Sequence, residues 1–228
     1  MRGIQLSMIL AVLVFCCVHA GQVEAEPQPV VSGTFYSESV GRELVFNIIL
    51  PAGYENSGKR YPVLYLLHGR GGGLDYWPNM GIAEYVANLD LIAVMPDVGV
   101  SWYVNWAESV GGEKNNWEDC ITKDLIGFVD AHYRTVASRK GRAITGASMG
   151  GYGALTLGFL HPDLFCSVSG HSAALRVPDR WRDRLNNIWA EPAVSEISGA
   201  SDQEAEKKPA VSLYFTRKAL LHFETSES

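Results

Sequence analysis

Residues 143–155 read AITGASMGGYGAL, and this stretch decides the fold. Within it, Gly146, Ser148 and Gly150 form the pattern G-x-S-x-G. An apolar run, AIT, precedes the pattern, and small and apolar residues with a helical pattern follow it. A sharp strand-to-helix turn needs small residues two positions before and after the serine, because the backbone and the helix close around it. The stretch therefore predicts a strand, a strained corner at Ser148 and a helix.

This corner makes Ser148 a candidate nucleophile. Its hydroxyl is expected to project from the carboxyl edge of the sheet, at the positive end of the following helix. The backbone N–H of Met149 would then point at the oxyanion that forms during attack on an acyl carbon. A chain with 23 glycines can also produce this pattern by chance, as a tight turn without chemistry. The strand before it and the helix after it favour the nucleophile.

Apolar runs elsewhere in the chain predict the rest of the sheet. Alternating residues predict an antiparallel pair of strands, GTFYSES and ELVFNIILP (33–39 and 43–51). Further strands are expected at VLYLLHG, LIAVMPD, AITGAS and FCSVSGHS (63–69, 91–97, 143–148 and 165–172). Helical patterns lie between these runs, at IAEYVANL, WEDCITKDLIGFVDAHY and GGYGALTLGFLH (82–89, 117–133 and 150–161). This alternation predicts an α/β protein whose mostly parallel sheet carries helices on both sides.

Composition sets limits on the domain and its partners. The chain has 228 residues, 47% of them hydrophobic, and a formal net charge of −6. These values are typical of a single globular domain with one large core. The negative charge argues against a nucleic-acid partner, because phosphate binding needs a basic face.

The N-terminus has the pattern of an export signal. Residues 8–18 are an apolar run too short to span a bilayer comfortably, and small-residue cleavage patterns end at Ala20 and Ala25. We expect a secretory signal peptide over residues 1–25, with a membrane anchor as the alternative. The mature domain, residues 26–228, would then be secreted or periplasmic, without stable membrane insertion.

Two cysteines, Cys120 and Cys166, remain after such a cleavage. An oxidising compartment would permit a disulfide between them, but sequence spacing does not show whether they approach each other. Two small buried thiols are the expected state. The chain has no C-x-x-C pair, no H-E-x-x-H motif and no clustered ligand spacing, so no metal is expected.

A second candidate stretch is LLHGRGGGLDYW, residues 66–77. A strand that ends in His68-Gly69 and continues into glycines is suited to supply a second oxyanion donor, through the backbone N–H of Arg70 or Gly71. The alternative is a glycine-rich loop that only turns the chain. His68 directly follows the strand and is interpreted as structural.

Four motifs together resemble a known family. They are YPVLYLLHG, SWYVNWAE (residues 101–108), GASMGGYGAL and HPDLF (residues 161–165). In this order they resemble the esterase family of α/β-hydrolases, which includes S-formylglutathione hydrolase (esterase D), feruloyl esterases and the mycolyltransferases of the antigen 85 complex. The resemblance runs from about Gly33 to Phe215. It implies an α/β-hydrolase three-layer sandwich and a serine acyl hydrolase or acyltransferase without metal or cofactor.

The resemblance also implies roles for individual residues. Ser148 would be the nucleophile, and the N–H groups of Met149 and Arg70 would form the oxyanion hole. Trp102 and Tyr103 would lie near the acyl pocket, although a pair of core aromatic residues is the alternative. The substrate would be an ester of a small molecule, a glycan or a lipid.

The base and the acid of a catalytic triad are harder to place. α/β-Hydrolases use the order serine, acid, histidine, and the family's acid follows the strand that here reads VSLYF, residues 211–215. No Gly or Asp occurs after Asp202, and His222 is the one histidine with the right order. His222 is thus a weak candidate base, and a frayed terminal residue is the alternative.

The family pattern stops after about residue 215. We therefore expect a chain that lacks the C-terminal strand and helix of the fold, as a frameshift or a premature stop would produce. The leading hypothesis is an exported serine carboxylic-ester hydrolase that forms an acyl-serine intermediate. The alternatives are an acyltransferase of the mycolyltransferase type, and a catalytically impaired esterase that acts at most as a binding scaffold.

Overall fold

The computed structural model describes residues 26–106 and 113–175. The strands are β1 (Val31–Ser37), β2 (Arg42–Ile49), β3 (Val63–Leu67), β4 (Ile92–Pro96), β5 (Arg142–Ala147) and β6 (Ser167–His171). The helices are α2 (Tyr76–Asn79), α3 (Ile82–Val86), α4 (Trp117–Asp119), α5 (Ile126–His132) and α6 (Met149–Leu160). A π-helical segment, η2 (Cys120–Leu125), joins α4 to α5, and η1 (Tyr54–Asn56) and η3 (Arg139–Gly141) are short 3-10 helices. Every strand expected from the sequence is present.

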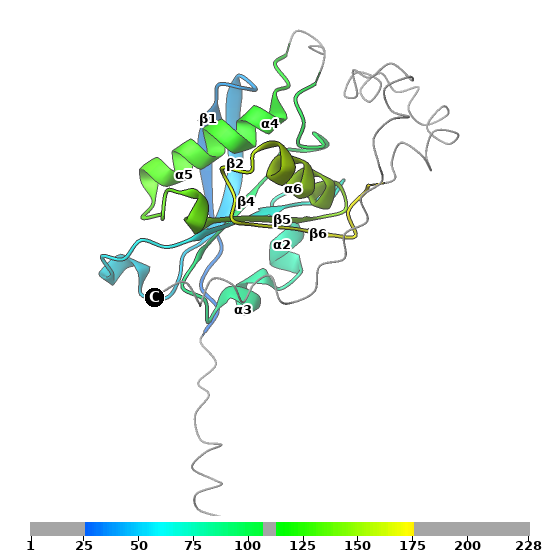
Figure 1. The fold of residues 1–228 in the computed structure, drawn as a ribbon. Helices are drawn as coiled ribbons and strands as arrows, with labels where there is room; N and C mark the ends of the chain where they lie inside the picture. The colour runs from blue at the N-terminus through cyan, green and yellow to red at the C-terminus, as the bar shows by residue number, and fades with distance from the viewer. Residues whose placement is uncertain (1–25, 107–112, 176–228) are drawn as a thin grey trace, which may run out of the picture.

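The strands form one sheet in the order β1-β2-β4-β3-β5-β6 (Figure 1). β1 pairs antiparallel with β2, and β2 pairs antiparallel with β4. The remaining neighbours, β4 with β3, β3 with β5 and β5 with β6, are parallel. The predicted antiparallel pair and mostly parallel sheet are therefore confirmed. Because parallel strands end at the same edge, the residues after β3, β4, β5 and β6 gather there.

Helices cover both faces of this sheet (Figure 1). α4, η2, α5 and α6 share one face, where Ile121, Val129 and Leu157 join the main hydrophobic cluster. α3 lies on the opposite face, where Ile82 and Val86 join a second cluster. The predicted three-layer α/β sandwich is confirmed.

Strand β3 shows why the sheet needs both helical layers. Its side chains alternate between the two clusters, with Val63, Tyr65 and Leu67 on the α6 side and Leu64 and Leu66 on the α3 side. All five are buried, with at most 6% of each residue exposed. Burial of each such apolar side chain contributes about 1.5–3 kcal/mol. This explains the continuous apolar run in the sequence.

The helix expected over residues 117–133 is present but is not uniformly α-helical. Its middle turns, Cys120–Leu125, are π-helical. There the Asp124 carboxylate accepts hydrogen bonds from the Ser37 hydroxyl at 2.5 Å and from the Ser39 amide at 2.9 Å. Thr122 donates its hydroxyl to the Glu118 carbonyl at 2.8 Å. The π-helical turns are therefore tied to the end of β1.

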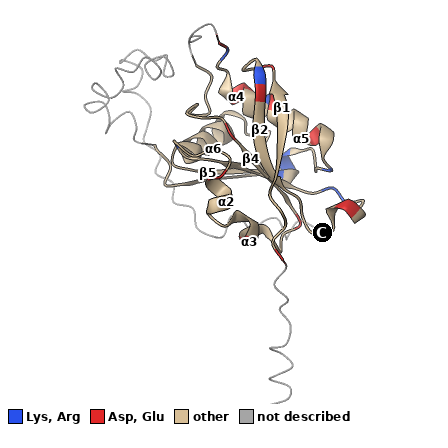
Figure 2. Cartoon of the chain, turned by 180° about the vertical axis from the view of Figure 1, so that it is seen from behind, with Lys and Arg blue, Asp and Glu red and all other residues tan. Residues whose placement is uncertain are grey.

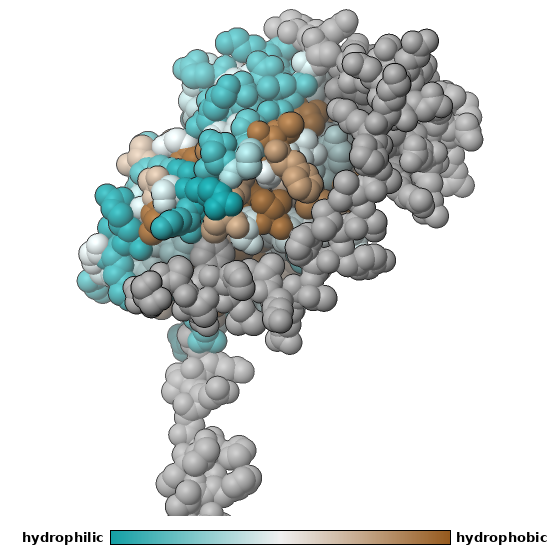
Figure 3. All heavy atoms as spheres, in the orientation of Figure 1, coloured by the Kyte–Doolittle hydropathy of each residue, from teal (hydrophilic) through white to brown (hydrophobic). Residues whose placement is uncertain are grey.

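The outer surface is mixed in character. Charged residues lie on α4, α5 and the loops, whereas β4 carries none (Figure 2). The last turn of α6 exposes apolar side chains, with Phe159 65% and Leu160 57% exposed. Apolar surface is visible in the region of α6 in Figure 3. Within residues 26–106 and 113–175, no helix is long and apolar enough to cross a membrane.

The expectation of two buried thiols is half right. Both cysteines of the described region are free, and Cys120 is buried in η2. Cys166 is exposed, because it lies in the turn before β6, where its thiol is 3.4 Å from the Lys140 carbonyl. The expected signal peptide, residues 1–25, and the segment after residue 175 lie outside the described residues.

Candidate active site

Ser148 lies at the corner between β5 and α6. Its backbone has φ 55° and ψ −112°, and the twelve-residue helix α6 begins at Met149. The serine is exposed, whereas Met149 is fully buried. The first N–H groups of a helix lack partners within it, so this end of α6 offers donors and a partial positive charge.

The two glycines of G-x-S-x-G are required by close packing. A Cβ atom at Gly146 would lie 2.2 Å from the Gly150 carbonyl oxygen, and one at Gly150 would lie 2.2 Å from the Leu67 carbonyl oxygen. No side chain fits at such distances. The small residues thus allow α6 to cross directly over the ends of β5 and β3, as the motif predicts.

The glycine-rich loop after β3 passes beside this corner. The Gly72 amide donates to the Gly69 carbonyl at 2.9 Å, which closes a turn with Arg70 and Gly71 at its two central positions. Gly71 has φ 74°, as the third residue of a type II turn requires. A Cβ atom at Gly69 would lie 3.6 Å from the Ser148 Cβ. The turn that carries the Arg70 amide therefore lies next to the serine.

Backbone strain is concentrated around the corner. Among the described residues, the non-glycine residues with positive φ are Trp102, Tyr103, Ser148 and Ser172. Trp102 and Tyr103 belong to the loop after β4, and Ser172 directly follows β6. Such conformations cost about 1–3 kcal/mol each and persist where the surroundings hold them. All four lie in segments that follow strands ending at the same sheet edge, and this marks the edge as the candidate site.

His68 has the structural role expected from its place after β3. The residue is 1% exposed. Its Nε2 accepts the Val98 amide at 3.2 Å, so its Nδ1–H is the donor to the Gly69 carbonyl at 2.9 Å. The two ring nitrogens thereby tie the start of the glycine-rich loop to the loop after β4.

The two aromatic residues expected near the acyl pocket occupy different environments. Tyr103 is fully buried, so here the alternative of a core aromatic residue holds. Its ring lies under α6, and its hydroxyl donates to the His68 carbonyl at 3.0 Å. Trp102 is half-buried and packs edge-to-face on Tyr152 of α6, with 5.7 Å between the ring centroids. Only Trp102 of the pair is placed to reach a ligand.

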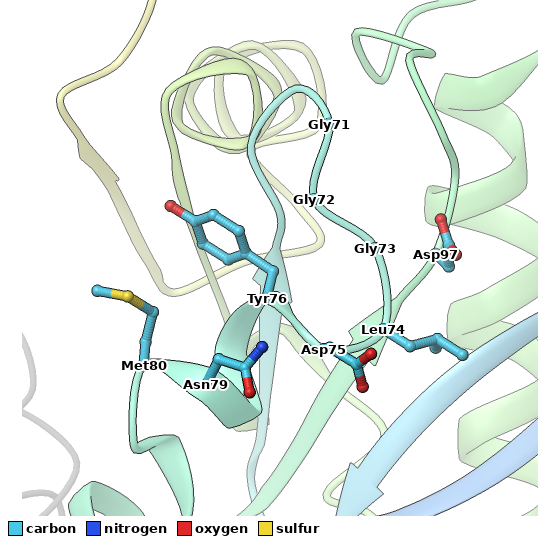
Figure 4. A pocket seen from close by; sticks show the side chains of 9 residues that line it. All are labelled: Gly71, Gly72, Gly73, Leu74, Asp75, Tyr76, Asn79, Met80 and Asp97. Atoms are coloured by element: carbon cyan, nitrogen blue, oxygen red, sulfur yellow. The ribbon is translucent and has the colours of Figure 1, made fainter.

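A pocket of about 560 Å³ opens beside the glycine-rich loop (Figure 4). Its lining residues are Gly71, Gly72, Gly73, Leu74, Asp75, Tyr76, Asn79, Met80 and Asp97. A Cβ atom at Gly73 would lie 3.3 Å from Oδ2 of Asp97, and Oδ1 of the same carboxylate accepts the Gly99 amide at 3.1 Å. Sequence reasoning missed this pocket, because its residues come from two loops and the short helix α2. The loop beside Ser148 therefore also forms the wall of an open, acidic pocket.

The described histidines do not complete a triad. His132 bonds through Nδ1 to the Phe128 carbonyl at 2.8 Å, and His161 pairs with Glu118 at 2.8 Å. His171 ends β6 next to the corner, and among the described residues no histidine hydrogen-bonds to the Ser148 hydroxyl. The candidate base His222 lies outside the described residues. Within residues 26–106 and 113–175, no group of three or more His, Cys, Asp or Glu side chains could hold a metal ion.

Comparisons with known proteins agree with this architecture. Esterase Rv1288 of Mycobacterium tuberculosis is 40% identical over 147 residues, which are 62% of this chain and 32% of that protein. This chain therefore spans about a third of the length of that relative. The solved structure of FphF, a fluorophosphonate-binding serine hydrolase of Staphylococcus aureus, matches at 25% identity and a TM-score of 0.64, covering 78% of this chain and 68% of FphF. The ferulic acid esterase AmCE1/Fae1A of Anaeromyces mucronatus matches at 27% identity and a TM-score of 0.55, covering 68% and 62%.

A family model described as "Putative esterase" matches residues 37–216. That range contains both the G-x-S-x-G corner and the glycine-rich loop. The family predicted from the four motifs is confirmed, and the chain belongs to this esterase family of α/β-hydrolases.

Proposed function

We propose that this chain is an exported serine carboxylic-ester hydrolase with Ser148 as its nucleophile. The observation that carries the proposal is an exposed serine at φ 55°, held at the start of a twelve-residue helix. A strained, solvent-facing serine beside helix N–H groups has little structural use, whereas acyl transfer needs this arrangement. The Met149 and Arg70 amides are the proposed oxyanion donors.

The reaction proceeds through an acyl-serine. A base takes the proton of the Ser148 hydroxyl as its oxygen bonds to the acyl carbon, and the carbonyl oxygen becomes an oxyanion between the two amides. The bond from the acyl carbon to the alcohol oxygen then breaks, and the alcohol leaves with the proton. In the second half the base takes a proton from water as the water oxygen bonds to the acyl carbon, the bond from that carbon to the Ser148 Oγ breaks, and the proton returns to Oγ as the acid leaves. His222 is the candidate base by chain order.

Substrates are proposed as esters of small molecules, glycans or lipids. AmCE1/Fae1A is a ferulic acid esterase, so esters of aromatic acids are the first class to assay. Trp102, half-buried against Tyr152, would lie along the acyl group. The signal-like segment over residues 1–25 supports a secreted or periplasmic location.

Hydrolysis of p-nitrophenyl acetate and of a feruloyl ester tests the proposal in the purified chain. Wild-type protein should release product, and Ser148→Ala should lose at least about a thousandfold in kcat, since triad members act as a unit. Equal rates in both proteins would show that the ester is cleaved elsewhere. A folded wild-type chain without turnover would favour the impaired scaffold.

A further inference from the structure

Tyr103 bridges the two elements that carry the proposed oxyanion donors. Its hydroxyl donates to the His68 carbonyl at 3.0 Å, at the start of the glycine-rich loop. Its ring lies against α6, because a Cβ atom at Gly153 would be only 2.4 Å from the ring. One buried side chain therefore contacts both the loop that bears Arg70 and the helix that bears Met149.

The Tyr103 ring packs directly against the backbone of α6. Gly153 is one turn beyond Met149 on α6, so the ring meets the helix close to its donor end. The missing side chain at Gly153 lets the ring and the helix backbone touch directly. Any shift of the ring must then move the first turn of α6 or open a cavity beneath it.

The conformation of Tyr103 is itself held in place. The residue has φ 60°, in a region that bulky side chains rarely adopt. Its amide donates to the Ser101 hydroxyl at 3.1 Å, and Ser101 is 1% exposed. Burial raises the pKa of Tyr103 well above its usual value, so the phenol stays protonated as a donor. The loop after β4 thus holds the Tyr103 hydroxyl in position to donate to the His68 carbonyl.

We infer that Tyr103 is a positioning residue that sets the separation of the Arg70 and Met149 amides. This inference rests on the proposed function. Two donors must converge on one oxygen within hydrogen-bond reach, and a small misplacement of either one reduces transition-state stabilisation. Tyr103 is buried and contacts both the glycine-rich loop and α6. It therefore controls the distance between the two amides without touching substrate.

Tyr65 provides a matched control. Like Tyr103 it is fully buried and packs in the same hydrophobic cluster. Its hydroxyl, however, has no hydrogen-bond partner among the described residues. Tyr65→Phe therefore removes a phenol hydroxyl from the same hydrophobic cluster but leaves the Tyr103 hydrogen bond to the His68 carbonyl in place.

The direct test compares the backbone amide resonances of Arg70 and Met149 in ¹⁵N-labelled wild type, Tyr103→Phe and Tyr65→Phe. Tyr103→Phe should shift both resonances and Tyr65→Phe neither. Unchanged resonances in Tyr103→Phe would overturn the inference, whether or not the chain hydrolyses esters. Ser101→Ala keeps the ring but removes the acceptor of the Tyr103 amide, so it should shift the same resonances. It replaces Tyr103→Phe in this test if Tyr103→Phe does not fold.

Kinetics separate positioning from general stability. Tyr103→Phe should lower kcat about tenfold, as loss of one buried hydrogen bond implies, and leave KM within about twofold. A rise in KM with unchanged kcat would contradict the inference. Turnover that persists in Ser148→Ala would instead refute the proposed function, while the amide resonances still decide the role of Tyr103.

Discussion

The backbone amide of Ser148 donates a hydrogen bond to the carbonyl oxygen of His171 at 2.9 Å. This bond continues the β5–β6 ladder one residue past its last pair, Ala147 with His171. The Ser148 carbonyl in turn accepts the Ala174 amide at 3.1 Å and the Tyr152 amide at 3.0 Å. The strained conformation of Ser148 is therefore held by the neighbouring strand β6, by the segment after β6 and by α6.

Gly150→Ala should strongly destabilise the protein. The added methyl group would lie 2.2 Å from the Leu67 carbonyl oxygen and 2.7 Å from that of His68, so α6 must move away from β3. We expect a loss of at least about 2 kcal/mol in the free energy of unfolding, as overpacking against backbone costs. Urea denaturation followed by circular dichroism measures the loss.

Gly127→Ala is the matched control for that substitution. Gly127 is exposed on α5 and has no atom within 4 Å of an added Cβ. Alanine should raise the free energy of unfolding by about 0.5–1 kcal/mol, because it has the higher helix propensity. Similar effects of the two substitutions would contradict the close crossing of α6 over β3.

Asp130→Ala should weaken the start of β5. The Asp130 carboxylate pairs with Arg142 and accepts the Thr135 hydroxyl at 2.6 Å, and the Arg142 side chain is only 9% exposed. Removal of the carboxylate leaves a buried guanidinium without its partner, which costs about 3 kcal/mol. Asp90→Ala breaks the exposed Lys59–Asp90 pair and should cost less than about 1 kcal/mol. Chemical denaturation measures the free energy of unfolding of both variants. Equal losses in Asp130→Ala and Asp90→Ala would refute the prediction.

Alkylation should distinguish the two cysteines of the folded domain. Cys166 is exposed, while burial raises the pKa of Cys120 to about 12. At pH 8, well below that value, Cys120 remains a neutral and inaccessible thiol. Iodoacetamide followed by peptide mass mapping should label Cys166 in the native protein and Cys120 only after denaturation. Rapid native labelling of Cys120 would show that η2 opens readily.

The strands and the corner could be predicted because their signals are local. Continuous apolar runs marked β3 and β4, and the spacing of Gly146, Ser148 and Gly150 marked the turn before α6. Strand order depends on pairings between distant segments, so the position of β4 between β2 and β3 could not be read from periodicity.

The burial of Tyr103 could not be predicted from the sequence either. The stretch SWYVNWAE has no clear period, and its aromatic residues suit a pocket as well as a core. Burial of Tyr103 follows from contact with Gly153, which lies far along the chain. The contact between η2 and β1 likewise joins segments that are distant in the sequence, because Ser37 of β1 donates to Asp124.

A fluorophosphonate probe tests the central claim most directly, because it phosphonylates an activated serine without requiring a complete catalytic cycle. Ser172→Ala is the matched control for Ser148→Ala, since Ser172 is also exposed, also has positive φ at 47°, and directly follows β6. Peptide mass mapping should place the adduct on Ser148 in the wild type and in Ser172→Ala, with no labelling in Ser148→Ala. An adduct on another residue, or none at all in a folded chain, would contradict the assignment of Ser148 as the nucleophile.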